Sequence, residues 1–364
     1  MEKVKIYPAK LTGTVQVPSS KSMGHREIIC AGLAGGTSIV DNISMSKDIE
    51  ATMRVLRAMN VSVDEIPSMI EGRKALQITG TGHPIAAADN VDCGESGSTL
   101  RFFIPLGANL GCPLTFIGHG KLVSRPLQAY YDILDKQFVQ YFNDNGNLPV
   151  NGHLMPGKFE LPGDVSSQFV SGLLFALPLL KGDSEIIITS PLESASYVDM
   201  TLNCLAKYGV KVENVDGAHR HYLVPGKQHF KAQDSKVEGD WSQAAFWTVG
   251  GALGAVCRYL LGNFISRASG SALPWGTFAI NIIGCFCMGL LMTLIVERGL
   301  LPAAWRLFLC VGLLGGFTTF SSFGYESLML LTEGNIAAAA AYSGGSLLLG
   351  LLAAGAGVLA GKGV

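Results

Sequence analysis

The chain has 364 residues, a formal net charge of −1, 15% charged residues and a mean hydropathy of +0.34. Its length exceeds the usual size of one domain and predicts two. The near-neutral charge lacks the basic footprint of nucleic-acid-binding proteins, so no nucleic-acid partner is expected. Only 8 of the 55 charged residues lie beyond Trp241. The composition therefore predicts a soluble region, residues 1–241, joined to a membrane region, residues 242–364.

Short β-branched or apolar runs alternate with helical patterns along the soluble region. The expected strands are residues 14–17, 37–40, 76–78, 114–117, 185–189 and 211–215. The expected helices are residues 48–59, 99–108, 125–136, 168–180 and 198–208. This alternation predicts a layered α/β domain.

Several helix starts in this region carry hydroxyl residues or glycine. They lie in residues 18–26, 94–101 and 163–168, and the basic residues near them and near a further start at Ser124 are Lys21, Arg26, Arg101 and Arg125. Unpaired N–H groups and the helix dipole make such starts anion sites. Ordinary N-capping would explain any single start. Together they predict a cleft for phosphate and carboxylate groups.

Four apolar stretches follow, at about 244–265, 273–296, 307–331 and 336–360. Each is long enough to cross a bilayer, which takes about 20 helical residues. Arg258 and Glu326 lie within the first and third stretches. Because a charge in hydrocarbon costs on the order of 2.5–3.5 kcal/mol, each is expected to face protein or water, although Glu326 could instead snorkel.

The third stretch contains the run Gly-Gly-Phe-Thr-Thr-Phe-Ser-Ser-Phe at residues 315–323. Two glycines and a hydroxyl run predict a loosened helix, whose freed carbonyls need protein, water or a hard cation as partners. Phe320 and Phe323 are spaced to share one face, where their electropositive ring edges could touch a small anion. Lipid contact or packing is the alternative interpretation. Asn281 in the second stretch also needs hydrogen-bond partners within the bilayer.

The basic residues that flank the stretches and the cysteines bear on location. Arg298, Arg306 and Lys362 lie on the N-terminal side of the four crossings, and only Arg267 lies opposite. This weakly favours an N-inside orientation. The eight cysteines have no CxxC spacing and the N-terminus has no apolar signal-peptide core, which indicates a reducing compartment. We expect a multi-pass protein of the cell membrane, in contact with lipid, whose soluble region is cytoplasmic.

Six ordered motifs in the soluble region resemble one enzyme family. They are Lys21-Ser22…Arg26, residues 95–101, 124–126, 164–169, Ser194…Asp199 and residues 237–242. They are similar to 5-enolpyruvylshikimate-3-phosphate (EPSP) synthase, or 3-phosphoshikimate 1-carboxyvinyltransferase. The resemblance implies a fold of βαβαββ units in two lobes, and enolpyruvyl transfer from phosphoenolpyruvate to shikimate 3-phosphate. This is a step of the shikimate pathway to aromatic amino acids and uses no cofactor.

The resemblance also implies roles for individual residues. Those matching phosphoenolpyruvate contacts are Lys21, Gly97, Arg125 and Gln168. Those matching shikimate 3-phosphate contacts are Ser22, Arg26, Ser166, Ser167 and Ser194. The motifs cover one lobe and the start of the other, without the half that carries the acidic general base. Independent catalysis is therefore not expected.

The membrane region resembles the fluoride-specific ion channel (Fluc) family. The matching strings are residues 250–259, 276–284 and 315–323, with Tyr342 and Ser346. The resemblance implies an antiparallel homodimer with two fluoride pores and a structural Na⁺ held by carbonyls of Gly315 and Thr318. Phe320 and Phe323 would form a phenylalanine box, and Asn281, Tyr342 and Ser346 a polar track. Gly350 stands where a further track serine is expected.

The sequence thus predicts an all-α four-helix membrane domain, exporting fluoride, fused to an incomplete α/β transferase lobe. Two alternatives stay open. One is a bifunctional protein with an active transferase tethered to the membrane. The other is a chimeric gene product joined across residues 249–255, because this small-residue string suits both families.

Overall fold

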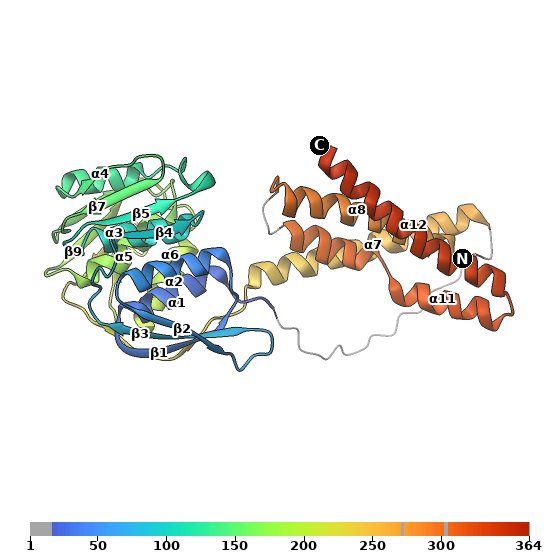
Figure 1. Cartoon of the computed structure of the whole chain (residues 1–364), viewed down its shortest axis with the longest axis horizontal. Coiled ribbons are helices and arrows are strands. Elements are labelled where there is room, and N and C mark those ends of the chain that lie inside the picture. The colour runs from blue at the N-terminus through green and yellow to red at the C-terminus, as the bar shows by residue number, and fades with distance from the viewer. Residues whose placement is uncertain (1–16, 271–272, 302–304, 364) are drawn as a thin grey trace. The chain divides into compact units, whose positions relative to one another are not determined.

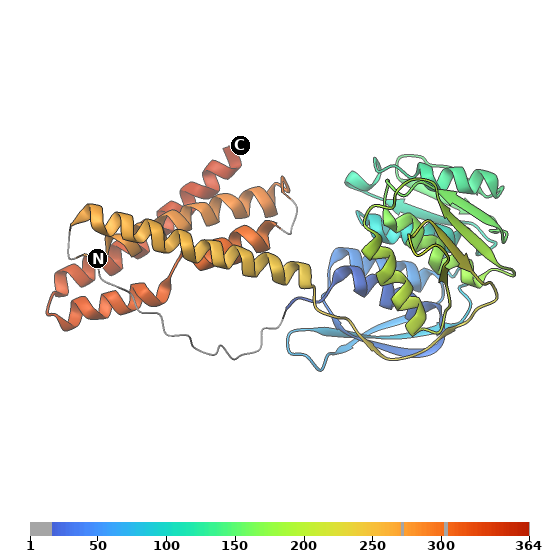
Figure 2. The same cartoon turned by 180° about the vertical axis from the view of Figure 1, so that it is seen from behind.

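The computed structural model describes residues 17–270, 273–301 and 305–363, which form two compact units (Figures 1 and 2). The α/β unit comprises Ser19–Gly239, and the helical unit runs from Asp240 onward. The expected strand at residues 14–17 lies outside the described residues except for Val17.

Two segments of the α/β unit each follow the order βαβαββ (Figure 1). The first contains β4 (Asn90–Gly94), α3 (Gly97–Gly107), β5 (Leu114–Gly118), α4 (Gln128–Lys136), β6 (Gln140–Tyr141) and β7 (Asn147–Asn151). The second contains β8 (Lys158–Leu161), α5 (Ser167–Ala176), β9 (Ser184–Ile188), α6 (Ala195–Lys207), β10 (Glu213–Asn214) and β11 (His221–Val224). In both sheets the first two strands are parallel and the others antiparallel, in the orders β4-β5-β7-β6 and β8-β9-β11-β10.

The third sheet follows a similar plan, but its parallel pairs are completed by two short strands from later in the chain. Its elements are α1 (Lys21–Leu33), β1 (Ala34–Ile43), α2 (Lys47–Ala58), β2 (Ser62–Pro67), β3 (Lys74–Thr81), β12 (Phe230–Lys231) and β13 (Ser235–Lys236). Both β12 and β13 pair parallel to β1, while β3 pairs antiparallel to β1 and to β2. The expected fold class of βαβαββ units is therefore confirmed.

Buried helices and capped N-termini organise this unit. α1, α3 and α5 are buried along most of their length, and one continuous apolar core joins them to the three sheets. The hydroxyls of Ser20, Ser96 and Ser166 accept hydrogen bonds from backbone N–H groups in the first turns of these helices. The three hydroxyl-rich segments thus begin helices, as predicted.

Proline shifts two predicted helix boundaries. α4 was expected from residue 125 but begins at Gln128, because a residue that precedes proline, here Arg125 before Pro126, disfavours the α conformation. Arg125 therefore lies before the helix, after the 3₁₀ turn η1 (Gly120–Leu122). The helix expected over 168–180 ends at Ala176, and a 3₁₀ turn, η2 (Leu177–Leu179), contains Pro178.

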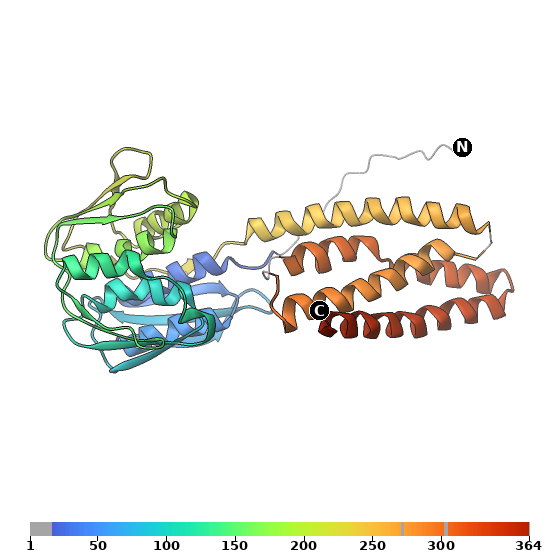
Figure 3. The same cartoon turned by 90° about the horizontal axis from the view of Figure 1, so that it is seen from above.

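The helical unit has four helices long and apolar enough to cross a membrane, as expected. These spans are Trp241–Ser269, Trp275–Glu297, Arg306–Thr332 and Ile336–Gly363. They are built from α7 (Trp241–Ser269), α8 (Trp275–Met292), the π-helical η3 (Thr293–Glu297) and η4 (Arg306–Leu314), α10 (Gly315–Phe317), α11 (Phe320–Thr332) and α12 (Ile336–Gly363). α7 is continuous, and α12 packs against α8 and α11 (Figure 3).

The third span is broken at two threonines (Figure 1). Thr318 (φ −80°, ψ 159°) and Thr319 (φ −150°, ψ 116°) have extended backbones between α10 and α11. The Thr319 hydroxyl accepts a hydrogen bond from the Ser322 N–H and so caps α11. The loosening predicted for residues 315–323 is therefore a complete interruption, placed at the threonines rather than at the glycines.

Candidate functional sites

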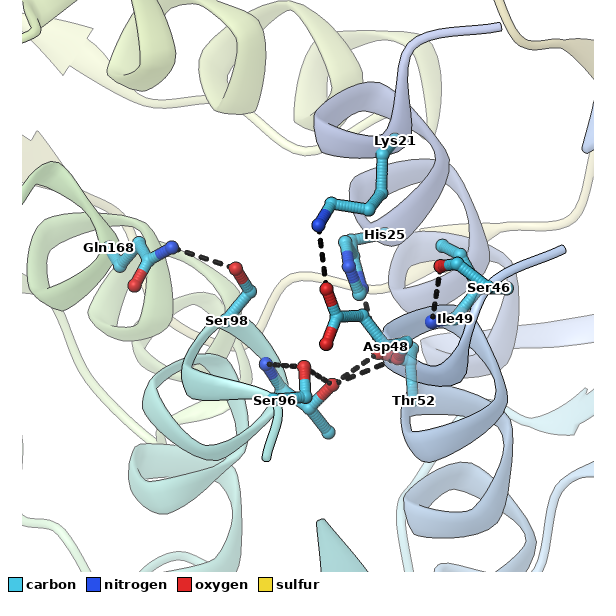
Figure 4. Close-up of polar contacts among 10 residues, drawn as sticks. Lys21, His25, Ser46, Asp48, Ile49, Thr52, Ser96, Ser98 and Gln168 are labelled. Carbon is cyan, nitrogen blue, oxygen red and sulfur yellow. Dashed lines mark hydrogen bonds and ion pairs between the residues drawn. The ribbon is translucent and has the colours of Figure 1, made fainter. Parts of the chain in front are cut away.

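The N-termini of α1, α2, α3 and α5 are joined by side-chain contacts along one edge of the α/β unit (Figure 4). Lys21 Nζ lies 2.6 Å from Asp48 Oδ2, which links α1 to α2. Gln168 Nε2 donates to Ser98 Oγ at 2.7 Å and links α5 to α3. We call this region, defined by Lys21, Asp48, Ser96–Ser98 and Gln168, the N-terminal edge. It gathers helix dipoles and polar side chains suited to an anion.

Gly97 and Arg125 are brought together at this edge. A Cβ atom at Gly97 would collide with the Arg125 guanidinium, so the absence of a side chain lets this cation lie over the start of α3. Arg101 lies nearby, and its Nη1 donates to Gln168 Oε1 at 2.9 Å. Two guanidinium groups beside a helix N-terminus favour a carboxylate or phosphate.

Burial and neighbouring charges shift two pKa values at the edge. Burial, followed by the positive charge of Arg125, lowers the pKa of Arg101. Burial raises the pKa of Asp48, but hydrogen bonding and attraction to Lys21 outweigh it, and the net pKa is lowered. Asp48 is therefore an ionised partner for the Lys21 ammonium at neutral pH.

Arg26 is located beneath the edge rather than on it. Its side chain is 2% exposed, and it donates to Thr201 Oγ1 at 2.7 Å, to the Tyr197 carbonyl at 2.9 Å and to the Ser22 carbonyl at 2.7 Å. Burial lowers its pKa to about 10, which leaves it charged at neutral pH. These hydrogen bonds connect α1 to α6 through Arg26.

The three predicted serines that remain lie at helix starts. Ser166 caps α5 and Ser167 is buried in its first turn. Ser194 precedes α6 in a left-handed backbone conformation, with φ of 59°. These positions are compatible with an anion approaching α5 and α6, and their ligand contacts stay a prediction.

A cavity of about 350 Å³ in the helical unit collects most of the predicted pore residues. Its lining includes Asn281, Thr318, Phe320, Phe323 and Ser346. The two phenyl rings are 5.7 Å apart between centroids, and Phe320 is 84% exposed. The Ser346 hydroxyl is buried and has no hydrogen-bond partner among the described residues. The cavity thus combines aromatic edges with an unsatisfied hydroxyl.

Side chains from two other helices hold the helix break. Asn281 of α8 accepts from the Thr319 N–H at 2.9 Å and donates to the Thr319 carbonyl at 3.1 Å. Arg258 of α7 donates to the Thr318 carbonyl at 3.3 Å. The partners that Asn281 needs within the bilayer are therefore backbone groups. Arg258 faces protein, as expected.

The break changes the partners of the two carbonyls that were expected to hold Na⁺. In a continuous helix, the Gly315 and Thr318 carbonyls would accept from the N–H groups of Thr319 and Ser322. Here those N–H groups donate to Asn281 Oδ1 and to Thr319 Oγ1. Carbonyl oxygens are suitable ligands for a hard cation, but the Thr318 carbonyl also accepts from the Arg258 guanidinium at 3.3 Å. A Na⁺ would share that oxygen with Arg258, and its binding stays a prediction.

Glu326 faces protein instead of snorkelling. Thr277 Oγ1 donates to Glu326 Oε1 and the Tyr342 hydroxyl donates to Oε2, each at 2.7 Å. Tyr342 is 6% exposed and its ring centroid lies 5.4 Å from that of Phe323. It therefore adjoins the cavity while its hydroxyl is committed to Glu326.

Sequence reasoning missed Asp48 as the partner of Lys21, and Arg258 and Asn281 as braces of the break. Asn281 was expected to need hydrogen-bond partners within the bilayer, but the sequence did not indicate which groups would supply them. Nothing local predicted that Asp48 would meet a residue 27 positions away, because that pairing depends on how α1 and α2 pack.

Comparisons with known proteins divide the chain close to the boundary between the α/β unit and the helical unit. The family model for EPSP synthase (3-phosphoshikimate 1-carboxyvinyltransferase) matches residues 6–257, and that for CrcB-like protein, Camphor Resistance (CrcB), matches residues 245–358. The two matches overlap at residues 245–257. This overlap falls within α7.

Among curated relatives, the 3-phosphoshikimate 1-carboxyvinyltransferase of Clostridium kluyveri is 49% identical over 256 residues, which cover 70% of this chain and 58% of the relative. That of Clostridium novyi is 44% identical, over 71% of this chain and 60% of the relative. The chain thus spans about three fifths of the length of these relatives.

A solved structure of EPSP synthase from Acinetobacter baumannii aligns with a TM-score of 0.57 and 25% identity. The alignment covers 66% of this chain and 53% of the other. The fold of the α/β unit and the family-model match therefore indicate the same family, EPSP synthase. The chain belongs to the EPSP synthase family through its N-terminal two thirds, and carries a CrcB-like domain as its C-terminal part.

Proposed function

We propose that the helical unit is a fluoride-specific channel that exports fluoride across the cell membrane. The observation that carries the proposal is the cavity in which Phe320, Phe323 and Ser346 lie together beside the helix break. Ring edges and a hydroxyl donor suit a small anion that has lost its hydration shell. The match to the CrcB-like family supports this function.

In this proposal a second copy of the chain covers the cavity. Phe320 is 84% exposed in one copy, so its ring is available to a partner. The Gly315 and Thr318 carbonyls would hold a Na⁺, which would supply structural positive charge at the break. Tyr342, Thr277 and Glu326 extend the polar path beyond Phe323.

Phe320→Ile tests the channel. An isoleucine keeps apolar bulk but removes the electropositive ring edge, so we expect fluoride efflux from liposomes to fall by at least about tenfold. Phe264→Ile is the matched control, because Phe264 is 70% exposed on α7 and does not line the cavity. Equal efflux from both variants and the parent protein would contradict the proposal.

A second function is favoured by the arrangement of Gly97, Arg125 and Gln168. We propose that the N-terminal edge binds phosphoenolpyruvate, with shikimate 3-phosphate beside it, through the part of the site present in this chain. The shared family supports the substrate class. Complete enolpyruvyl transfer would require groups supplied by another polypeptide.

Gly97→Ala tests this binding. The new Cβ would displace the Arg125 guanidinium, so phosphoenolpyruvate affinity, measured by calorimetry on the full chain in detergent, should fall about tenfold. Gly35→Ala in β1 is the control, because its Cβ would make only ordinary contacts, at 3.7 Å or more. Unchanged affinity in Gly97→Ala would argue against binding at this edge.

A further inference from the structure

A buried chain of hydroxyl groups runs from His25 to the N-terminal edge (Figure 4). His25 Nδ1 lies 2.8 Å from Thr52 Oγ1, which lies 2.9 Å from Thr99 Oγ1. Thr99 Oγ1 lies 2.8 Å from Ser96 Oγ. All four side chains are at most 2% exposed, so water cannot substitute for these contacts. The proton arrangement within the chain is therefore set by its two ends.

The edge end of the chain is an acceptor. Thr99 Oγ1 lies 3.2 Å from the backbone carbonyl oxygen of Asp48, which can only accept, so Thr99 donates there. Because Thr99 has a single hydroxyl proton, its contacts with Ser96 and Thr52 require both of those hydroxyls to donate to Thr99.

The other end must then be a donor. Since the proton of Thr52 is directed to Thr99, Thr52 accepts from His25, and His25 carries its proton on Nδ1. Burial lowers the pKa of His25 to about 3, so the ring is neutral and Nε2 bears no proton. Nε2 is buried without a hydrogen-bond partner among the described residues, which an unprotonated nitrogen tolerates better than an N–H group.

Two parts of the edge depend on this chain. Ser96 caps α3 by accepting from the Thr99 N–H at 3.3 Å, immediately before Gly97. Asp48 holds Lys21 Nζ at 2.6 Å. A single polar network therefore connects His25 with Lys21 and with the start of α3, the two groups that would contact an anion.

We propose that neutral His25 is a positioning residue. As an Nδ1–H donor at the base of the hydroxyl chain, it fixes Ser96 and Asp48 and so orients the Lys21 ammonium toward the bound anion. This inference rests on the proposed binding of phosphoenolpyruvate at the N-terminal edge. It concerns the arrangement of that site and assigns His25 no contact with the ligand.

The first test breaks the chain and then restores it. Thr52→Val removes the relay hydroxyl, and phosphoenolpyruvate affinity of the full chain in detergent should fall about three- to tenfold. Thr52→Ser keeps the hydroxyl, and His25→Asn keeps an N–H donor, so both should stay within about twofold of the parent. Ser38→Ala is the control, because Ser38 is equally buried but lies in β1, where it accepts from the Gln233 N–H.

The second test needs no ligand. Nitrogen-15 NMR of histidine-labelled full chain should show His25 as the Nδ1–H tautomer, and carbon-13 NMR should show Asp48 titrating at higher pH in Thr52→Val but not in Ser38→Ala. An Nε2–H tautomer, or an Asp48 titration unmoved by Thr52→Val, would overturn the positioning role. If the parent bound no phosphoenolpyruvate, the proposed binding function would fail while the tautomer and titration still decided the role of His25. If the parent bound it and Thr52→Val bound equally well, the inference would fail alone.

Discussion

His25 makes the α/β unit sensitive to acid at the scale of one residue. Its pKa is lowered by burial from 6.5 to about 3, whereas in the unfolded chain it stays near the ordinary value. Between pH 6.5 and about pH 3, His25 is protonated in the unfolded state but neutral in the folded state. The free energy of unfolding therefore decreases as the pH falls below 6.5. The slope is about 1.4 kcal/mol per pH unit, or about 2 kcal/mol at pH 5.

We predict that His25→Asn removes this contribution. Opening free energies of α1 amides, measured by hydrogen exchange and corrected for intrinsic rates, should fall less between pH 7 and pH 5 in the variant than in the parent. Exposed His153 is a suitable control, because His153→Asn should leave the parent's pH dependence intact. An identical pH dependence in His25→Asn and the parent would show that His25 is not buried in the neutral form.

At the scale of elements, the break in the third membrane span depends on α8. Asn281 satisfies both backbone groups of Thr319, and no other residue of the described chain is shown to bond either one. Removing the amide would leave an N–H and a carbonyl unpaired at membrane depth. The extended conformation at Thr319, and with it the direction of Phe320 at the start of α11, should then be lost.

We predict that Asn281→Leu destabilises the helical unit by about 1–3 kcal/mol, from two lost hydrogen bonds, and abolishes fluoride efflux. Thermal unfolding in detergent and liposome efflux measure the two effects. Thr248→Val is the control, since the Thr248 hydroxyl bonds only within α7, to the Ala244 carbonyl. Full efflux by Asn281→Leu would mean that the break does not need this brace.

Predictability at this scale followed the strength of local signals. Serine caps and apolar length were enough to predict the starts of α1, α3 and α5 and the four membrane spans. The helix expected from Arg125 begins instead at Gln128, because Pro126 disfavours the α conformation at the residue before it. The strand β6 was not predicted, and the strand expected over residues 211–215 is shorter in the structure, where it is β10, because two-residue pairings carry almost no periodic signal.

At the scale of the whole molecule, α7 is the point where the two families meet. It is one uninterrupted helix from Trp241 to Ser269, and both family models match its residues 245–257. Asp240 caps it by accepting from the Gln243 N–H. A helix that satisfies both sequence patterns explains how the join leaves no spacer.

Membrane orientation is where the fusion has consequences for the proposed channel. An antiparallel dimer needs half of the copies inserted in each direction, but basic flanks favour the N-inside orientation, and the opposite one would export the α/β unit. We predict that the fusion impairs dual insertion, so that N-inside copies outnumber N-outside copies and only a minority of the chains can form antiparallel dimers. A cysteine added at the N-terminus should be labelled by an impermeant maleimide mainly after the cells are opened, with the unmodified chain as control for its own thiols. Equal labelling of intact and opened cells would contradict the prediction.

Charge, apolar length and ordered motifs are local properties, so the two-part organisation, the four apolar spans and the families could be predicted from the residues alone, whereas the roles of the site residues stay predictions. The contacts of these residues depend on the tertiary structure. In the fold, Lys21 pairs with Asp48 and Arg26 is buried beneath the N-terminal edge. The side-chain oxygen and nitrogen of Asn281 both bond to the backbone of Thr319. Glu326 accepts hydrogen bonds from Thr277 and Tyr342. Each of these contacts joins different helices, and the packing that brings such helices together depends on the whole fold rather than on the spacing of residues within any one of them.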